Sequence, residues 1–206
     1  MEIIQVYNES PDYPVALQHF LGDKVPKTIT ATGAIDLLAN KSLAFFCSVK
    51  CPGNLILRTH DFAQQLKQAP VTIIGGFHSP VERECLTILL RSTNPLIICP
   101  ARGIENMRIP ADCKKPLAEG RLLLLSPFSG KQHRATAEMA SYRNEVVAAL
   151  AEQIFVAYAE PSGKTERFCQ RIIEWQKPLY TFASEANANL ISLGAKVLDE
   201  NPVGML

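Results

Sequence analysis

Short apolar runs without polar alternation most restrict how this chain can fold. From residue 43 onward each run ends in a small or polar turn, and a stretch with helical spacing follows. Strands that are apolar at every position have both faces covered, which is typical of parallel sheets. The sequence therefore predicts an α/β fold, a doubly wound, mostly parallel sheet with helices on both faces. Strands are expected at residues 43–47, 71–74, 96–99, 122–125, 154–157 and 179–181, and helices at 55–66, 80–90, 135–150, 165–175 and 187–193.

The chain is long enough for one sizeable domain. It has 206 residues, of which 47% are hydrophobic and 20% charged, so it can bury a core without disulfides or a metal. Residues 1–40 contain several prolines and few periodic apolar positions. We expect them to form a helical or irregular lead-in packed on the main domain, which spans residues 41–206. The apolar runs are far shorter than a membrane span, and we see no signal peptide, so a cytoplasmic protein without membrane contact is expected.

The six cysteines are then expected to be free thiols. Their spacing does not match a zinc site, and we expect neither a metal nor a cofactor. Cys47 and Cys51 are four residues apart. They are a weak candidate for a metal or redox pair, and the simpler interpretation is two small buried thiols.

The net charge of +1 excludes a globally basic nucleic-acid coat protein. It leaves room for a local basic groove, because the sum hides clustering. Two basic groups follow expected strands and would lie at the end of the sheet where ligands bind. They are Arg102, Arg108, Lys114 and Lys115 after the strand at 96–99, and Lys131, His133 and Arg134 after the strand at 122–125.

The most informative motif follows the strand expected at residues 71–74. Gly75 and Gly76 allow a sharp turn and a close approach by a ligand. Ser79 and Glu82 have the spacing of a capping box, so the next helix begins with free N–H groups that favour an anion. His78 on this turn would face the ligand crevice, although a loop histidine is more often solvated. Capping alone would account for Ser79 and Glu82.

A second candidate anion site follows the strand expected at residues 154–157. Ser162, Gly163, Lys164 and Thr165 resemble the end of a phosphate-binding loop, but the full pattern needs a glycine where Tyr158 stands. What remains is a turn into a helix, with Ser162 or Thr165 as the cap and Lys164 as a candidate phosphate contact.

Two weaker candidates complete the predicted site. Arg143 and Asn144, inside a helical stretch, are candidates for phosphate, base or ribose contacts, although a solvated helix face is the simpler interpretation. Ser48 and Lys50 follow the first expected strand and can donate hydrogen bonds to a phosphate.

The order of these motifs resembles the DprA/Smf family of DNA-processing proteins, which is related to the phosphoribohydrolase group. The resemblance covers residues 13–198 and implies a Rossmann-like domain. It is carried by Tyr13-Pro14, Cys47-Ser48-Val49, the segment Gly75 to Glu82, Arg143-Asn144-Glu145, Ser162-Gly163-Lys164-Thr165, and the segment Asn187 to Ala195.

The chain departs from the family pattern at several of these positions. Cys47 replaces a glycine, Val49 replaces an arginine, and Glu145 replaces the second arginine of an Arg-Asn-Arg motif. Within these 206 residues we expect none of the additional helical and winged-helix modules found in many members. It therefore resembles a short, divergent branch.

The resemblance implies a homodimer that binds single-stranded DNA, takes part in DNA uptake or recombination, and hands the strand to a RecA-type recombinase. A binding protein without catalytic residues is the favoured interpretation. The alternative is a small-nucleotide sensor, or a nucleotide N-glycoside hydrolase like the related phosphoribohydrolases, in which Glu82 beside His78 would be the acid/base group. A third possibility is an interaction subunit with a vestigial pocket.

Overall fold

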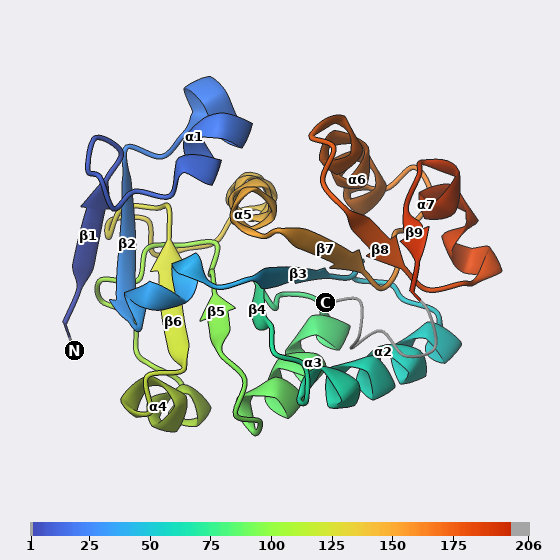
Figure 1. The fold of residues 1–206 in the computed structure, drawn as a ribbon, viewed down its shortest axis with the longest axis horizontal. Helices are drawn as coiled ribbons and strands as arrows, with labels where there is room; N and C mark the ends of the chain where they lie inside the picture. Colours follow the sequence, from blue (N-terminus) through green and yellow to red (C-terminus); the bar gives the residue numbers. More distant parts are fainter. Residues whose placement is uncertain (1, 199–206) are drawn as a thin grey trace.

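The computed structural model describes residues 2–198 as one α/β sheet with helices on both faces (Figure 1). The sheet has the strand order β1-β2-β6-β5-β4-β3-β7-β8-β9. The pairings β6-β5-β4-β3-β7-β8-β9 are parallel, and β2 runs antiparallel to both β1 and β6. The strands are β1 (Ile4–Tyr7), β2 (Thr28–Gly33), β3 (Ser42–Phe46), β4 (Thr72–Gly75), β5 (Leu96–Ile98), β6 (Leu122–Ser126), β7 (Gln153–Val156), β8 (Leu179–Thr181) and β9 (Lys196–Val197).

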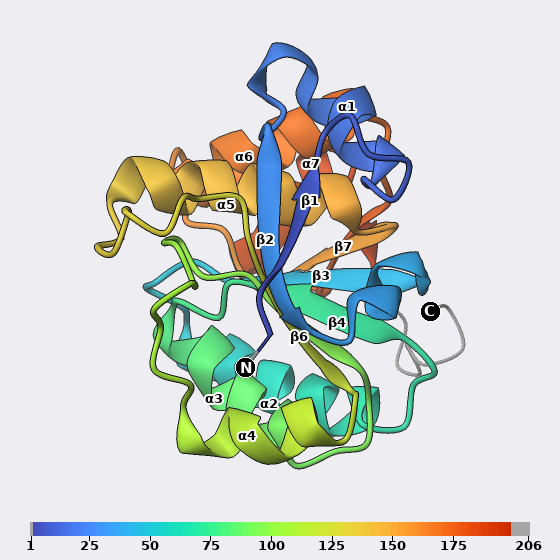
Figure 2. The same ribbon diagram turned by 90° about the vertical axis from the view of Figure 1, so that its left-hand side faces the viewer.

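The helices form two layers, one on each face of the sheet (Figure 2). One layer contains α2, α3 and α4, and the other contains α1, α5, α6 and α7. The α-helices are α1 (Val15–Leu21), α2 (Gly53–Leu66), α3 (Pro80–Leu90), α4 (Ala111–Ala118), α5 (Ala137–Leu150), α6 (Lys164–Glu174) and α7 (Ala188–Ser192). Three short 3-10 helices are η1 (Gly22–Lys24), η2 (Ile35–Ala39) and η3 (Glu185–Asn187).

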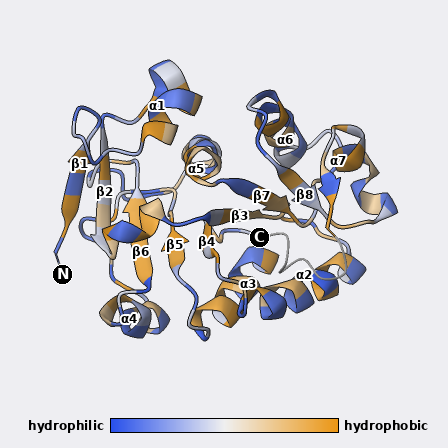
Figure 3. Cartoon of the chain, in the orientation of Figure 1, coloured by the Kyte–Doolittle hydropathy of each residue, from blue (hydrophilic) through white to orange (hydrophobic). Residues whose placement is uncertain are grey.

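Alternate residues of the central strands supply two separate apolar cores. In β3, Leu43 and Phe45 pack in the core beneath α2 and α3, whereas Ala44 and Phe46 pack in the core beneath α5 and α6. All four side chains are at most 3% exposed. Figure 3 shows the same apolar character in β5 and β6 of this sheet. Burial on both faces explains the lack of polar alternation and confirms the predicted α/β fold class.

The first forty residues contribute more order than the sequence suggested. The expected helical element is present as α1, but β1 and β2 extend the same sheet, so the expectation of an otherwise irregular lead-in was wrong. Residues Ile29–Thr32 of β2 are all buried, and the threonines among them are polar. The sequence of this strand therefore lacks both a continuous apolar run and a regular apolar–polar alternation. Thr32 is only 1% exposed, and its hydroxyl donates to the carbonyl of Glu2 at 2.8 Å. Hydrogen bonding of this kind allows a polar side chain to occupy a buried strand position.

Most later elements lie where the sequence predicted them, within about two residues. Helix α4 was missed, because its eight residues include Pro116 and two adjacent lysines. Strand β9 was missed because it has only two residues, both exposed.

The topology brings the ends of β3 and β7 together at the centre of the sheet. The chain proceeds from β3 through β4 and β5 to β6 on one side, and then crosses to β7 on the other. Such a reversal leaves a crevice at the carboxyl ends of the strands, the common ligand position in open α/β sheets. We call this side of the sheet the carboxyl edge.

Among residues 2–198, no helix has the length and apolar character needed to cross a bilayer.

Lys177 joins the helical layer to the N-terminal segment. Its ammonium donates to the carbonyls of Ala148 and Ala149, each at 2.7 Å, and to that of Ala151 at the end of α5. The same ammonium lies 4.1 Å from the ring centre of Phe20, next to the last residue of α1. One cation therefore satisfies carbonyls at the end of one helix and contacts a second element.

Replacing Lys177 with Met should lower the free energy of unfolding by about 1–2 kcal/mol, because partly buried carbonyls lose their donor. Chemical denaturation at neutral pH measures this change. Lys114→Met on exposed α4 is the control and should alter stability by less than about 0.5 kcal/mol. Equal effects of the two substitutions would contradict the role given to Lys177.

Candidate functional site

The Glu82 carboxylate holds two loops of the carboxyl edge together. One oxygen accepts from the backbone N–H of Cys47 at 2.8 Å. The other accepts from the backbone N–H groups of His78 at 2.7 Å and Ser79 at 3.2 Å. Glu82 is only 5% exposed, so these backbone donors take the place of water around a buried charge. The end of β3 and the turn after β4 are thereby fixed to each other.

The predicted capping box at the start of α3 is present. Ser79 is the N-cap, and its hydroxyl accepts from the backbone N–H of Glu82 at 3.3 Å. In the preceding turn, Phe77 has a φ of 48°, a conformation that side chains rarely adopt. Its ring is 4% exposed and packs within the core beneath α2 and α3. Burial of this ring compensates for the unfavourable backbone conformation.

Gly76 makes room for Arg143 of the same chain. A Cβ at Gly76 would lie 1.5 Å from Nη1 of Arg143. Arg143 is 3% exposed, and Nη1 donates to the carbonyl of Cys99 at 2.8 Å. Its Nε donates to Oδ1 of Asn144 at 2.8 Å. The simpler interpretation of Arg143, a solvated helix face, is therefore wrong, because the helix packs this side chain against the turn.

Burial lowers the pKa of Arg143, and the nearby Glu82 opposes that shift. An arginine remains charged under all ordinary conditions. A fixed positive charge from α5 therefore lies against the turn after β4, within the protein and not on its surface.

Ser48 connects the two halves of the sheet at the reversal point. Its backbone N–H donates to the carbonyl of Tyr158 at 2.9 Å, and its hydroxyl donates to Oγ1 of Thr165 at 2.9 Å. The hydroxyl also accepts from the backbone N–H of Glu160 at 3.1 Å. Ser48 is 6% exposed. These contacts bring together two segments that the sequence analysis considered separately.

The N-cap residue of helix α6 is not the one that the sequence predicted. Its N-cap is Gly163, which has no side chain to accept a hydrogen bond. Ser162 adopts a φ of 59°, and the carbonyl of Ser162 accepts from Arg167 at 3.0 Å. The predicted caps Ser162 and Thr165 were thus wrong, since the Thr165 hydroxyl is directed to Ser48.

Three adjacent cavities lie along the carboxyl edge. The first, the arginine cavity, has about 550 Å³. The second, the central cavity, has about 290 Å³, and the third, the outer cavity, has about 420 Å³. The arginine cavity is lined by residues that include Gly76, His78, Arg102, His133, Arg134 and Arg143. The central cavity is lined by residues that include Cys47, Ser48, His78, Arg143, Lys164 and Phe168. The outer cavity is lined by residues that include Ser141, Glu145, Lys164, Arg167, Phe168 and Arg171.

Neighbouring cavities share walls. His78 and Arg143 belong to both the arginine and the central cavity, and Lys164 and Phe168 belong to both the central and the outer cavity. We call the three together the edge groove. It follows the first half of α5, from the loops after β5 and β6 to the start of α6.

The edge groove is positively charged along much of its length. Among the described residues that line the arginine cavity, none carries a carboxylate. In the central cavity, both oxygens of the Glu82 carboxylate accept hydrogen bonds from backbone N–H groups. The outer cavity has two carboxylates and three cations in its wall. Glu145 forms an ion pair with Arg171, so a neighbouring helix compensates the acidic replacement noted in the sequence. Glu138 lies in the same wall as Lys164 and Arg167.

The structure brings most of the predicted site residues to the edge groove. Those lining it are Ser48, Gly76, His78, Ser79, Glu82, Arg143, Asn144, Lys164 and Thr165. Gly75, Lys50, Ser162 and Gly163 are outside these linings. Gly75 is buried against the Phe77 ring, and Lys50 and Ser162 are exposed on adjacent loops.

Two residues that line the groove, Arg167 and Phe168, were not predicted from the sequence. They occupy the same helix as Lys164, and four-residue spacing places Phe168 on the same face as Lys164. That spacing was a signal that could have identified Phe168.

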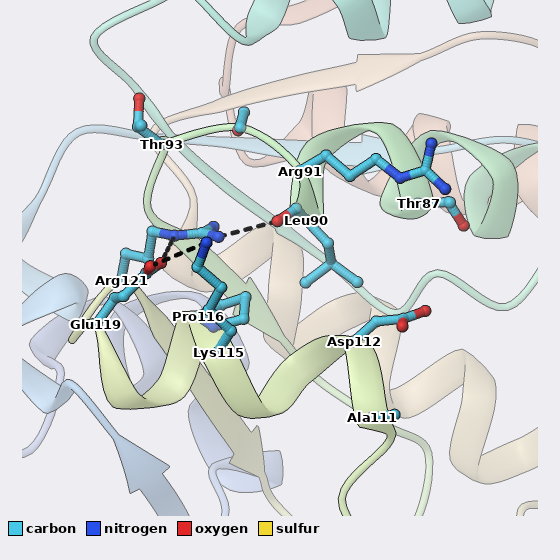
Figure 4. A pocket seen from close by; sticks show the side chains of 11 residues that line it. Thr87, Leu90, Arg91, Thr93, Ala111, Asp112, Lys115, Pro116, Glu119 and Arg121 are labelled. Atoms are coloured by element: carbon cyan, nitrogen blue, oxygen red, sulfur yellow. Dashed lines mark hydrogen bonds and ion pairs between the residues drawn. The ribbon is translucent and has the colours of Figure 1, made fainter.

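A further cavity of about 500 Å³ lies at the opposite, amino edge of the sheet (Figure 4). Arg121 there donates to Glu119 at 2.8 Å and to the carbonyl of Leu90 at 2.9 Å. Lys115 is 3.7 Å from Glu119. These internal pairs balance much of the charge, and the basic residues Arg108, Lys114 and Lys115 do not line the edge groove.

Comparison with protein families identifies the lineage. Residues 5–202 match the family model of DNA recombination-mediator protein A. The chain belongs to this family. Among curated proteins, none matches the sequence significantly.

Solved structures support the same fold. DNA processing protein A (DprA) from Streptococcus pneumoniae aligns with a TM-score of 0.81 at 17% identity, covering 100% of this chain and 74% of that one. DNA processing protein A from Helicobacter pylori, described for its single-stranded DNA binding mode, aligns with a TM-score of 0.77 at 16% identity, covering 100% and 95%. The molybdenum cofactor carrier protein from Chlamydomonas reinhardtii is more distant, with a TM-score of 0.53 at 12% identity, covering 80% and 93%.

Glu82→Gln should lower the free energy of unfolding by about 2–3 kcal/mol, because the amide group cannot accept from all three backbone donors. Thermal and chemical unfolding measure the loss. Glu84→Gln on the same helix is the control. Its side chain is 60% exposed, and its pair with His60 at 2.7 Å should contribute less than about 1 kcal/mol. A Glu82→Gln variant as stable as the control would refute the anchoring role.

Gly76→Ala should be destabilising only while Arg143 is present, because the new methyl group and the guanidinium occupy the same space. A double-mutant cycle with Arg143→Ala should give a coupling energy of at least about 1 kcal/mol. Gly53→Ala, where a Cβ meets no atom within 4 Å, should show no coupling to Arg143. Additive effects of Gly76→Ala and Arg143→Ala would contradict the contact.

Proposed function

We propose that this family member binds single-stranded DNA along the edge groove, without catalysing a reaction on it. The observation that carries the proposal is the sharing of walls between three cavities, which gives an extended track rather than one closed pocket. An extended track with cations along its length suits a chain of phosphates.

The charged groups of the groove fall into two classes. Arg143 is internal and fixed, whereas Arg102, Arg134 and Lys164 are exposed on loops or at the start of a helix. Exposed cations can neutralise phosphates and release bound counterions, which favours binding at low salt. Arg143 instead maintains a positive potential at the centre of the groove.

The central cavity also supplies an aromatic surface. Phe168 lines it and packs edge-on against Phe46, with ring centres 5.0 Å apart. A partly buried ring held in one orientation provides a surface against which any of the bases of a nucleic acid can stack. This combination of a ring and cations favours a nucleic acid over a simple inorganic polyanion.

The hydrolase alternative receives less support from the geometry. Its candidate acid/base group, Glu82, is buried, and both of its oxygens accept from backbone N–H groups. These contacts are those of a structural anchor. Binding to DNA therefore remains the function we propose, and it agrees with membership in a DNA recombination-mediator family.

The same family membership supports our further proposal that the chain acts as a homodimer in DNA recombination or uptake, with a RecA-type recombinase as its partner. Sedimentation with and without that recombinase tests these two assemblies directly.

A fluorescent single-stranded oligonucleotide should bind with an affinity that falls steeply as salt rises, because each neutralised phosphate of a single strand contributes about 0.7 to the logarithmic slope. Fluorescence anisotropy at several salt concentrations measures this slope. A panel of mononucleotides is titrated in parallel. Tight binding of a mononucleotide together with no binding of the oligonucleotide would favour the sensor alternative and reject our proposal.

Lys164→Gln and Arg134→Gln should each weaken oligonucleotide binding several-fold, and each should reduce the salt slope by up to about 0.7, independently of sequence. Lys115→Gln, at the amino edge, is the matched control and should leave both quantities unchanged (Figure 4). Equal effects of the three substitutions would show that binding depends on overall charge and not on the edge groove.

A further inference from the structure

Two cysteines border the edge groove at the end of β3. Cys47 follows the last residue of the strand and lines the central cavity, and Cys51 precedes the N-cap of α2, Pro52. The chain bends between them at Val49 and Lys50. After this bend Cys51 packs against the same apolar cluster that contains Cys47, so the two thiols lie close enough to influence each other.

The two thiols differ in accessibility. Cys47 is 6% exposed, whereas Cys51 is only half-buried. Cys51 is also positioned just before the first turn of a 14-residue helix. The free N–H groups at the start of a helix stabilise a nearby thiolate. Cys51 is therefore placed to react first with a reagent from solution.

The acidities of the thiols agree with this order. The hydrogen bond from Cys47 lowers the pKa of Cys51, and the same hydrogen bond, together with burial, raises the pKa of Cys47. Burial raises the pKa of Cys85, Cys99 and Cys169 to about 12. Burial also raises the pKa of Cys113.

We propose that Cys47 and Cys51 are a modification site, at which a small-molecule disulfide such as oxidised glutathione forms a reversible disulfide between them. This inference does not depend on the proposed DNA binding. The loop that the bond would close carries Ser48, Val49 and Lys50. Val49 is 67% exposed and lines the central cavity, so oxidation alters the wall of the groove directly.

The reaction proceeds by two thiol–disulfide exchanges. The Cys51 thiolate attacks one sulfur of oxidised glutathione, whose S–S bond breaks, and one glutathione thiolate leaves. The hydrogen bond that Cys47 made to the Cys51 thiolate is then lost, which removes the main cause of its raised pKa. Cys47 loses its proton to solvent and attacks the Cys51 sulfur, and the second glutathione thiolate leaves. Two protein thiols are oxidised by two electrons, and one molecule of oxidised glutathione is reduced to two thiols.

Incubation of the folded 206-residue chain with oxidised glutathione should reduce its titratable thiols from six to four, and dithiothreitol should restore all six. Trypsin cleaves after Lys41, Lys50 and Arg58, so it cuts the chain between the two cysteines. A non-reducing digest should then contain the peptide of residues 42–50 joined to that of residues 51–58. Mass spectrometry detects the joined pair, and reduction separates it.

Substitutions test the order of attack. Cys51→Ser should abolish the joined peptides and leave the thiols of the folded protein unreacted, whereas Cys47→Ala should stop the reaction at a glutathione adduct on Cys51. Cys85→Ala is the matched control, because Cys85 belongs to the same apolar cluster as Cys47, and Cys51 packs against that cluster. This control should still yield the joined peptides.

Circular dichroism before and after oxidation establishes that each variant retains its fold. Six unreacted thiols in a folded protein would overturn the proposal. A joined pair that contains Cys85 would overturn it as well, because the bond would then connect α3 and not close the loop after β3.

Discussion

One buried carboxylate determines the shape of the carboxyl edge. Glu82 accepts hydrogen bonds from the end of β3 and from the turn after β4, so two neighbouring strands present their following loops in a fixed relation. A buried charge is stable only when such donors replace its water. The turn that Glu82 fixes is also the turn on which Arg143 rests. The Glu82 carboxylate, the turn after β4 and the Arg143 side chain thus form one connected unit in the wall of the groove.

The opposite side of the groove depends on a neutral contact. Ser48 joins β3 to the segment after β7, and the Thr165 hydroxyl completes this link at the start of α6. Because β3 and β7 are neighbours only in space, the contact can form only after the sheet has assembled. The cations of α6 are therefore positioned by the topology, and not by their own loop.

The divergence of this chain from its family has a physical consequence at the same place. Cys47 stands where the family resemblance places a glycine, and its backbone N–H still reaches Glu82. The added thiol belongs to the apolar cluster against which Cys51 packs, at the edge of the groove. Glu145, a second departure, is neutralised by Arg171 on the next helix. The chain thus retains the architecture of the edge while changing the chemistry of its wall.

The sequence by itself determined the class of the fold and the positions of most later elements, because strands covered on both faces must be apolar throughout and the capping box marks the start of α3. It also indicated which loops would gather at one edge. Only the tertiary structure decided the roles within that edge. Gly76 indicates a place for a ligand to approach, yet Arg143 from α5 fills the space. Glu82 is consistent with a helix cap and with an acid/base group, yet its carboxylate also anchors the end of β3. Such roles depend on contacts between residues far apart along the chain, which local patterns do not contain.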